Sequence, residues 1–168
     1  MTRSRTIRSR ALLGFLLLAV SLSSAQQVRT IGKKGLDSLI ANRNGKVLLL
    51  NVWATWCIPC KEEFPDLVKL SAEMKGRNAE VVAVSVDFPD EIGEKVAPFV
   101  KKMKTPFRVY VADFASQDEF FASFDKRWSG AIPATFVYDA SGKQQQFLLG
   151  KQRHDQLKKA VEDVLVKR

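Results

Sequence analysis

The chain has 168 residues, of which 46% are hydrophobic and 27% charged. This composition excludes a disordered or fibrous protein and suits one globular domain with its own core. The formal net charge is +9, but four of the 27 basic residues are Arg3, Arg5, Arg8 and Arg10, and without them the excess over the 18 acidic residues is about five. The other basic residues are interspersed with acidic ones and form no stripe alternating with aromatic residues, so we expect no binding to nucleic acid.

The first 25 residues have the three-part pattern of a secretory signal peptide. A basic stretch at 1–10 precedes an apolar run at 11–20, and the small residues Ser23 and Ala25 provide a cleavage site after Ala25. The alternative is an uncleaved membrane anchor, although the apolar run is short for a spanning helix. We therefore expect a domain at 26–168 that lies outside the cytoplasm, in the periplasm, either soluble or tethered by its N-terminus.

After this segment, strand patterns alternate with helix patterns. The first half predicts a short strand at 27–31, a helix at 35–44, a continuously apolar strand at 46–53, a long helix at 57–76 and a second apolar strand at 79–87. The second half predicts a helix at 88–103, which begins at an Asp90 cap and is interrupted by Pro98. It then predicts a short strand at 107–111, a short helix at 116–128, a β-hairpin at 134–150 and a terminal amphipathic helix at 154–167. This alternation is typical of one α/β domain.

Cys57 and Cys60 are the only cysteines, and they lie where an apolar strand turns into a helix. Unpaired backbone N–H groups and the helix dipole stabilise a negative sulfur at this end of a helix, which favours the nucleophilic thiolate. We expect Cys57 to be the exposed nucleophile and Cys60 to be partly shielded behind it. A zinc site is an alternative, but it needs about four ligands and the only histidine, His154, lies in a distant polar segment. A purely structural bridge is another, and it would close only a very short loop.

The segment NVWATWCIPCKEEFP, residues 51–65, resembles the active-site segment of the thioredoxin superfamily. Its WATWC-x-PC-x-x-E-x-P form is closest to the extracytoplasmic TlpA/ResA group of thiol-disulfide oxidoreductases. The similarity extends over residues 27–166, because AIPATFVYD, SGK and FLLG follow in the family's order. It implies a thioredoxin-like fold, with a central mixed sheet flanked by helices and a TlpA-like central insertion between the segments SVDF (85–88) and RWSG (127–130). We expect Phe120, Phe121 and Phe124 to be core contacts of this insertion; the alternative is a surface that binds a partner.

The resemblance also implies roles for residues around the cysteines. Pro133 matches the family's cis-proline, which lies beside the cysteines and leaves the backbone of Ile132 free to pair with an extended substrate. Pro65 matches the proline that kinks the active-site helix. Three more residues are expected to shape the site or set its reduction potential: Trp56 at the rim that contacts a client, and the dipeptide Ile58-Pro59 between the cysteines.

Glu63 matches the glutamate of the ResA-like motif. It lies three residues after Cys60, on a neighbouring face of the same helix. A half-buried carboxylate there is suited to accept the proton that leaves Cys60 when a mixed disulfide is resolved. Asn51 replaces the aspartate of cytosolic thioredoxin, so we expect proton handling to pass to Glu63. The alternative is that Glu63 is a solvated helix residue like its neighbour Glu62.

The implied function is that of a monomeric thiol-disulfide oxidoreductase with no cofactor beyond its Cys57–Cys60 disulfide and no metal. Its clients would be disulfide-containing proteins, of which apocytochrome c is the family's best-known type, and a membrane donor of the DsbD/CcdA type would reduce it again. The direction of electron flow depends on the reduction potential, so a disulfide-donating oxidase of the same fold is the alternative. A peroxidase is less favoured because the reactive cysteine has a near resolving partner. A copper-binding or chaperone module would need a further His or Met ligand near the cysteines.

Overall fold

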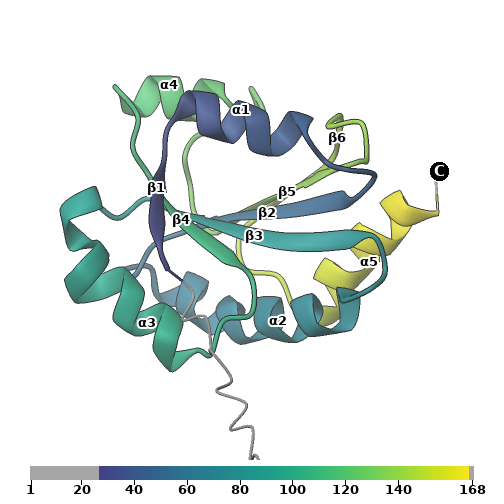
Figure 1. Cartoon of the computed structure of the whole chain (residues 1–168), viewed down its shortest axis with the longest axis horizontal. Coiled ribbons are helices and arrows are strands. Elements are labelled where there is room, and N and C mark those ends of the chain that lie inside the picture. The colour runs from purple at the N-terminus through teal and green to yellow at the C-terminus, as the bar shows by residue number, and fades with distance from the viewer. Residues whose placement is uncertain (1–26, 167–168) are drawn as a thin grey trace, which may run out of the picture.

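A mixed, six-stranded sheet forms the centre of the computed structural model, which describes residues 27–166 (Figure 1). Across the sheet the strands are β1 (Arg29–Ile31), β4 (Arg108–Ala112), β3 (Ala79–Ser85), β2 (Val47–Trp53), β5 (Ala134–Tyr138) and β6 (Gln144–Leu149). The first four are parallel, whereas β5 runs antiparallel to both of its neighbours, β2 and β6. The predicted α/β fold with a central mixed sheet is therefore confirmed. The predicted signal peptide lies outside the described residues.

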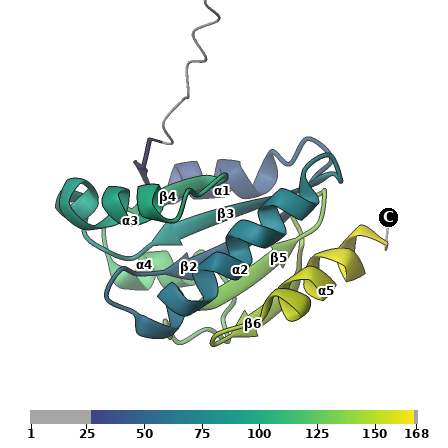
Figure 2. The ribbon, with the colours of Figure 1, turned by 90° about the horizontal axis from the view of Figure 1, so that it is seen from below.

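Helices cover both faces of this sheet (Figures 1 and 2). One face carries α1 (Lys33–Ala41) and α4 (Gln117–Ala122), and the other carries α2 (Ile58–Met74), α3 (Ala97–Lys102) and α5 (His154–Leu165). Within the part of the chain that the structure describes, no helix is both long and apolar enough to cross a bilayer.

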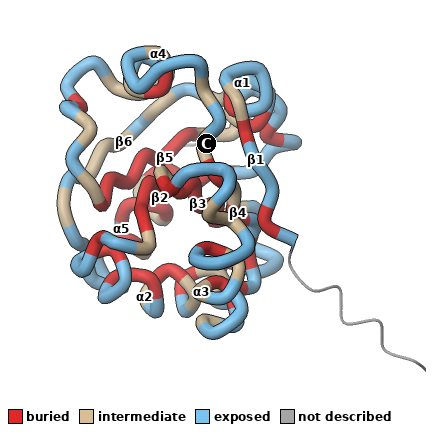
Figure 3. The backbone as a smooth tube through the Cα atoms, turned by 90° about the vertical axis from the view of Figure 1, so that its left-hand side faces the viewer, coloured by how far each residue is buried: buried red, intermediate tan, exposed pale blue. Residues whose placement is uncertain are grey.

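Strand β2 is buried along its whole length, between two cores (Figure 3). Leu49 and Trp53 belong to the core on the α2 side, whereas Leu48 and Leu50 belong to the core on the α1 side. Successive side chains of a strand point to opposite faces, so a strand covered on both faces must be apolar throughout. The packing thus accounts for the continuous apolar run, and it fixes the end of β2, from which the cysteine segment leaves the sheet.

The segment between β3 and β4 departs from the predicted helix 88–103. A 3-10 turn and a π-helical turn precede α3, at Pro89–Glu91 and Ile92–Val96. The prediction that Asp90 caps a helix is wrong, because Asp90 lies inside the 3-10 turn and the backbone N–H of Phe88 donates to the Glu91 carboxylate (3.0 Å). Pro98 lies in the first turn of α3. Since proline has no N–H, Pro98 cannot donate the α-helical hydrogen bond back into the preceding turn, which agrees with the wider winding before α3.

The central insertion contributes an aromatic cluster on the α1 side of the sheet. The buried ring of Phe120 lies 5.0 Å from that of Phe124 and 5.8 Å from that of Trp128, measured between ring centroids. Phe121 also contacts Trp128 (5.1 Å), and Phe124 stacks on Phe136 of β5 (4.7 Å). The insertion residues are therefore core contacts, as predicted, although α4 is shorter than the predicted helix 116–128.

Candidate active site

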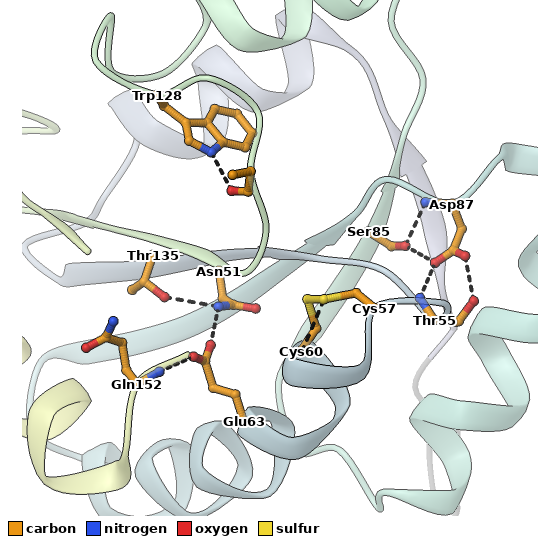
Figure 4. Close-up of a disulfide and its surroundings, with 11 residues drawn as sticks. Asn51, Thr55, Cys57, Cys60, Glu63, Ser85, Asp87, Trp128, Thr135 and Gln152 are labelled. Carbon is orange, nitrogen blue, oxygen red and sulfur yellow. Dashed lines mark hydrogen bonds between the residues drawn. A yellow bond between two sulfur atoms is a disulfide. The ribbon is translucent and has the colours of Figure 1, made fainter. Parts of the chain in front are cut away.

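Cys57 and Cys60 form a disulfide at the N-terminus of α2 (Figure 4). Cys57 immediately precedes the helix, and its sulfur accepts a hydrogen bond from the backbone N–H of Cys60 (3.2 Å). The N–H of Cys57 donates to the carbonyl of Ala54 (3.2 Å), which closes a four-residue turn between β2 and α2. The predicted strand-to-helix location is confirmed, and a thiolate at Cys57 would find a backbone donor in place.

Cys57 is less accessible than the sequence predicted. Its exposed fraction is 6% and that of Cys60 is 1%. The expectation of an exposed Cys57 is therefore wrong, although Cys57 is the more exposed of the two cysteines, as predicted. The residues on either side of Cys57, Trp56 and Ile58, are 63% and 66% exposed. A reactant that approaches the Cys57 sulfur therefore meets apolar surface around it.

Two prolines lie in α2. Pro59 is in the first turn, where a helix loses no hydrogen bond by the missing N–H. Pro65 lies inside the helix and is exposed, at the position that the resemblance implied. It removes one internal hydrogen bond of the helix. The kink expected at Pro65 remains a prediction.

The peptide bond between Ile132 and Pro133 is cis, as the resemblance implied. The carbonyl of Pro133 accepts a hydrogen bond from the N–H of Gly150 (2.9 Å), just beyond β6. On the other side of the bond, the indole N–H of Trp128 donates to the carbonyl of Ala131 (2.8 Å). The loop before β5 is thus anchored on both sides. Trp128 was not predicted as a site residue, because its partner is a backbone atom in a loop whose path the sequence does not specify.

A groove of about 610 Å³ lies beside the cysteine turn. The groove is lined by Trp56 and Ile132, which lie far apart in the sequence, together with Phe88 and Phe121. The turn that carries Cys57 and the residue before the cis-proline therefore border the same groove. An apolar segment of another protein could occupy this groove next to the disulfide.

Glu63 is buried on the inner side of α2 (Figure 4). Only 1% of the residue is exposed, so the interpretation as a solvated surface residue is wrong, and the burial exceeds the predicted half. One carboxylate oxygen accepts from Nδ2 of Asn51 (2.7 Å) and the other from the backbone N–H of Gln152 (2.6 Å). Desolvation by burial raises the pKa of Glu63 from 4.5 to about 7, and these two hydrogen bonds partly oppose that rise.

Asn51 connects Glu63 to a third segment. Its Nδ2 also donates to the hydroxyl of Thr135 on β5 (3.0 Å), so the carboxylate, β2, β5 and the loop before α5 form one network. The sequence did not point to Thr135 or Gln152. Thr135 follows the cis-proline by two residues, which offers a weak signal, whereas Gln152 contributes its backbone N–H and its residue type therefore gives none.

Within residues 27–166, no three His, Cys, Asp or Glu side chains lie close enough together to hold a metal ion. His154 lies 3.1 Å from the carboxylate of Glu73, a pair that joins α5 to α2. Among the described residues, the two cysteines therefore have no His, Asp or Glu beside them that would complete a set of three metal ligands.

The combination of a Cys-x-x-Cys disulfide at a helix N-terminus, a cis-proline before a neighbouring antiparallel strand and a central mixed sheet defines a thioredoxin-fold protein. The model of the AhpC/TSA family matches residues 14–146. The chain therefore belongs to that family.

Relatives and solved structures agree with this assignment. The thiol-disulfide oxidoreductase ResA of Geobacillus kaustophilus is 28% identical over 131 residues, which are 78% of this chain and 70% of the relative. The ResA of Oceanobacillus iheyensis is 30% identical over 125 residues, 74% of this chain and 60% of the relative. A thiol:disulfide interchange protein of the thioredoxin family from Chlorobium tepidum superposes with a TM-score of 0.62 at 26% identity, over 74% of this chain and 83% of that one. The resemblance to the ResA group is confirmed.

Proposed function

We propose that this protein is an extracytoplasmic thiol-disulfide oxidoreductase that reduces disulfides in client proteins. The observation that carries the proposal is the Cys57–Cys60 disulfide at the start of α2, in a chain whose Ile132–Pro133 bond is cis. The ResA relatives are named for the same activity. The proposed activity needs no cofactor, because the reduced Cys57/Cys60 dithiol itself supplies the two electrons and becomes the disulfide.

The reaction begins with the reduced protein. The thiolate of Cys57 attacks one sulfur of a client disulfide, forms a mixed disulfide and releases the other client sulfur as a thiolate, which takes up a proton. Cys60 then loses its proton, attacks the sulfur of Cys57 and displaces the second client thiolate. Two electrons have moved to the client, which leaves as a dithiol, and the protein is left with its Cys57–Cys60 disulfide.

Glu63 is the proposed acceptor of the Cys60 proton. A general base is most effective when its pKa is near the working pH, and the pKa of Glu63 is raised to about 7. Asn51 is proposed to orient this carboxylate through its 2.7 Å hydrogen bond. The client is proposed to pair with the backbone of Ile132 beside Pro133 and to contact Trp56, while Ile58, Pro59 and Pro65 set the shape and potential of the helix terminus.

The proposed location and partners rest on the sequence pattern and on the relatives. Residues 1–25 would direct the chain out of the cytoplasm, where an oxidising environment requires a source of electrons. A membrane dithiol carrier of the DsbD/CcdA type would supply them by the reverse exchange at Cys57. Cytochrome c maturation is the proposed process, with the cysteine pair of an apocytochrome c as client.

A trapping experiment tests this function. Cys60→Ala should accumulate a mixed disulfide with a client, because the resolving thiol is missing, and Cys57→Ala should abolish trapping. The adducts are counted on non-reducing gels and by mass spectrometry, before and after reduction. Equal trapping by Cys57→Ala and by Cys60→Ala would contradict the assigned order of attack.

The reduction potential decides the direction of electron flow. Equilibration of the Cys57/Cys60 couple with glutathione should give a value near or below about −250 mV, in the range of thioredoxin-like reductants. A value near about −120 mV would instead identify a disulfide donor and replace the reductase proposal by the oxidase one.

A further inference from the structure

Asp87 is a buried carboxylate on the side of the disulfide opposite Glu63 (Figure 4). Only 2% of the residue is exposed. Its Oδ2 accepts hydrogen bonds from the backbone N–H of Thr55 (2.8 Å) and from the hydroxyl of Ser85, and its Oδ1 accepts one from the hydroxyl of Thr55 (2.5 Å). The mechanism proposed above assigns this group no part.

The contacts of Asp87 converge on the turn that carries the nucleophile. Thr55 is the second residue of the turn closed by the bond from the Cys57 N–H to the Ala54 carbonyl. Asp87 therefore holds both the backbone and the side chain of a residue two positions before Cys57. Trp56, between Thr55 and Cys57, is 63% exposed, so the packing of its side chain restrains the turn little.

Parallel strand pairing explains why Asp87 reaches this turn from 30 residues away in sequence. β2 and β3 run parallel, with Trp53 opposite Ser85, so the chain segments that follow the two strands leave the same edge of the sheet. Ser85 also accepts a hydrogen bond from the Asp87 N–H (3.0 Å), which fixes Asp87 relative to the end of β3. The turn is thereby tied to the rigid centre of the sheet.

We infer that Asp87 is a positioning residue that holds the Ala54–Cys57 turn so that the sulfur of Cys57 stays in place to form the bond with Cys60. The inference rests on the proposed redox role of the two cysteines. Asp87 holds the turn through the hydrogen bonds that it accepts, and not through its negative charge.

The equilibrium with glutathione measures this positioning. In that reaction the protein disulfide and two glutathione thiols give the protein dithiol and one glutathione disulfide, so two electrons and two protons pass to the protein. Loosening the turn lowers the effective concentration of the Cys57 thiol at Cys60 and thus disfavours the protein disulfide. A role confined to general stability would weaken oxidised and reduced forms alike and leave the equilibrium constant unchanged.

Two substitutions at Asp87 separate hydrogen bonding from charge. Asp87→Ala removes every acceptor and should lower the equilibrium constant for disulfide formation about tenfold, equivalent to a rise of about 30 mV in reduction potential. Asp87→Asn removes the charge, but its amide oxygen retains an acceptor for the Thr55 N–H and its amide group is able to donate to the Thr55 hydroxyl. Asp87→Asn should therefore stay within about threefold of the wild-type constant.

Asp139→Ala is the matched control. Asp139 accepts hydrogen bonds from the N–H and hydroxyl of Ser141 (2.9 and 2.6 Å) in the turn of the β5–β6 hairpin, at the end of the sheet away from the disulfide. Its loss should lower the unfolding free energy without changing the glutathione equilibrium. If Asp87→Ala does not fold, Thr55→Val carries the test, because it deletes one donor, leaves the charge, and should lower the constant about threefold.

Three results would overturn the inference: a constant for Asp87→Ala equal to wild type, an equal loss for Asp87→Asn and Asp87→Ala, or the same loss for Asp139→Ala. In the Thr55→Val version, a wild-type constant would overturn it. A wild-type protein that failed to reduce any client disulfide, while its glutathione equilibrium still responded to Asp87→Ala as expected, would contradict the proposed function and leave the role of Asp87 intact.

Discussion

Replacement of Glu63 by glutamine tests the energetic consequence of burying a carboxylate beside the disulfide. In the folded protein the pKa of Glu63 is about 7, against an ordinary value of 4.5. The causes are desolvation first, then the opposing hydrogen bonds from the Gln152 N–H and Asn51. The folded state therefore binds this proton more tightly than the unfolded state does, and protonation of Glu63 stabilises the fold.

The pKa difference gives both the sign and the size of the effect. Below pH 4.5 the carboxyl group is protonated in both states, and the stabilisation is complete. As the pH rises from 4.5 to about 7, the unfolded state releases the proton first, so the free energy of unfolding falls. At 1.36 kcal/mol for each pH unit, the loss is about 3 kcal/mol once the pH exceeds 7.

Urea unfolding of the oxidised protein at pH 4.5, 6, 7 and 8 measures this loss. A glutamine at position 63 does not titrate, so the free energy of unfolding of Glu63→Gln relative to wild type should increase by about 3 kcal/mol across the range. Glu62→Gln is the control, because exposed Glu62 lies on the same helix and pairs with Lys151 at the surface. A difference between wild type and Glu63→Gln that changes by less than about 1 kcal/mol over this range would refute the reasoning.

Two further predictions concern stability away from the disulfide. Glu80→Ala should cost about 3 kcal/mol, since it leaves the fully buried Arg43 guanidinium without the carboxylate that it contacts. Arg43→Met should cost less, because it removes the buried charge itself and leaves Glu80 paired with Arg108. Urea unfolding compares the two variants, and equal losses would contradict the argument. Gly142→Ala should cost more than Gly45→Ala in the same assay, because both residues have positive φ but only at Gly142 does an added Cβ lie 2.6 Å from a carbonyl oxygen of α1. Equal costs would show that the close contact relaxes.

Local sequence signals were sufficient for the sheet and for the place of the cysteines. The run at 47–53 is apolar at every position but Asn51, as a strand covered on both faces requires, and β2 occupies Val47–Trp53. Cys57 was placed at the start of a helix because an apolar strand ends just before it. Both features depend on residues that are neighbours in the chain.

The details that sequence reasoning missed depend on distant partners. Glu63 was predicted as half buried, and its complete burial follows from its contacts with Asn51 and with the N–H of Gln152, 89 residues away. The predicted Asp90 cap is wrong because the chain already winds into the 3-10 turn Pro89–Glu91, which places Asp90 inside the turn and not before it. Cys57 was expected to be exposed, since its position at a helix terminus says nothing about the side chains that pack around it.

Burial that destabilises the fold is also what suits Glu63 to accept a proton. A carboxylate with an ordinary pKa is almost fully ionised at pH 7 and is a weak base, whereas Glu63, with a pKa of about 7, accepts a proton readily and is still about half ionised at that pH. One titration should therefore appear in two measurements: the pH dependence of unfolding and the pH dependence of the rate at which Cys60 resolves a mixed disulfide. The wild-type resolution rate should rise with a midpoint near the folded-state pKa of about 7, the pH at which the fall in the free energy of unfolding levels off, and Glu63→Gln should remove that rise. A rate midpoint more than about one pH unit away from that levelling-off, or an unchanged rate profile in Glu63→Gln, would show that the buried carboxylate is not the acceptor of the Cys60 proton.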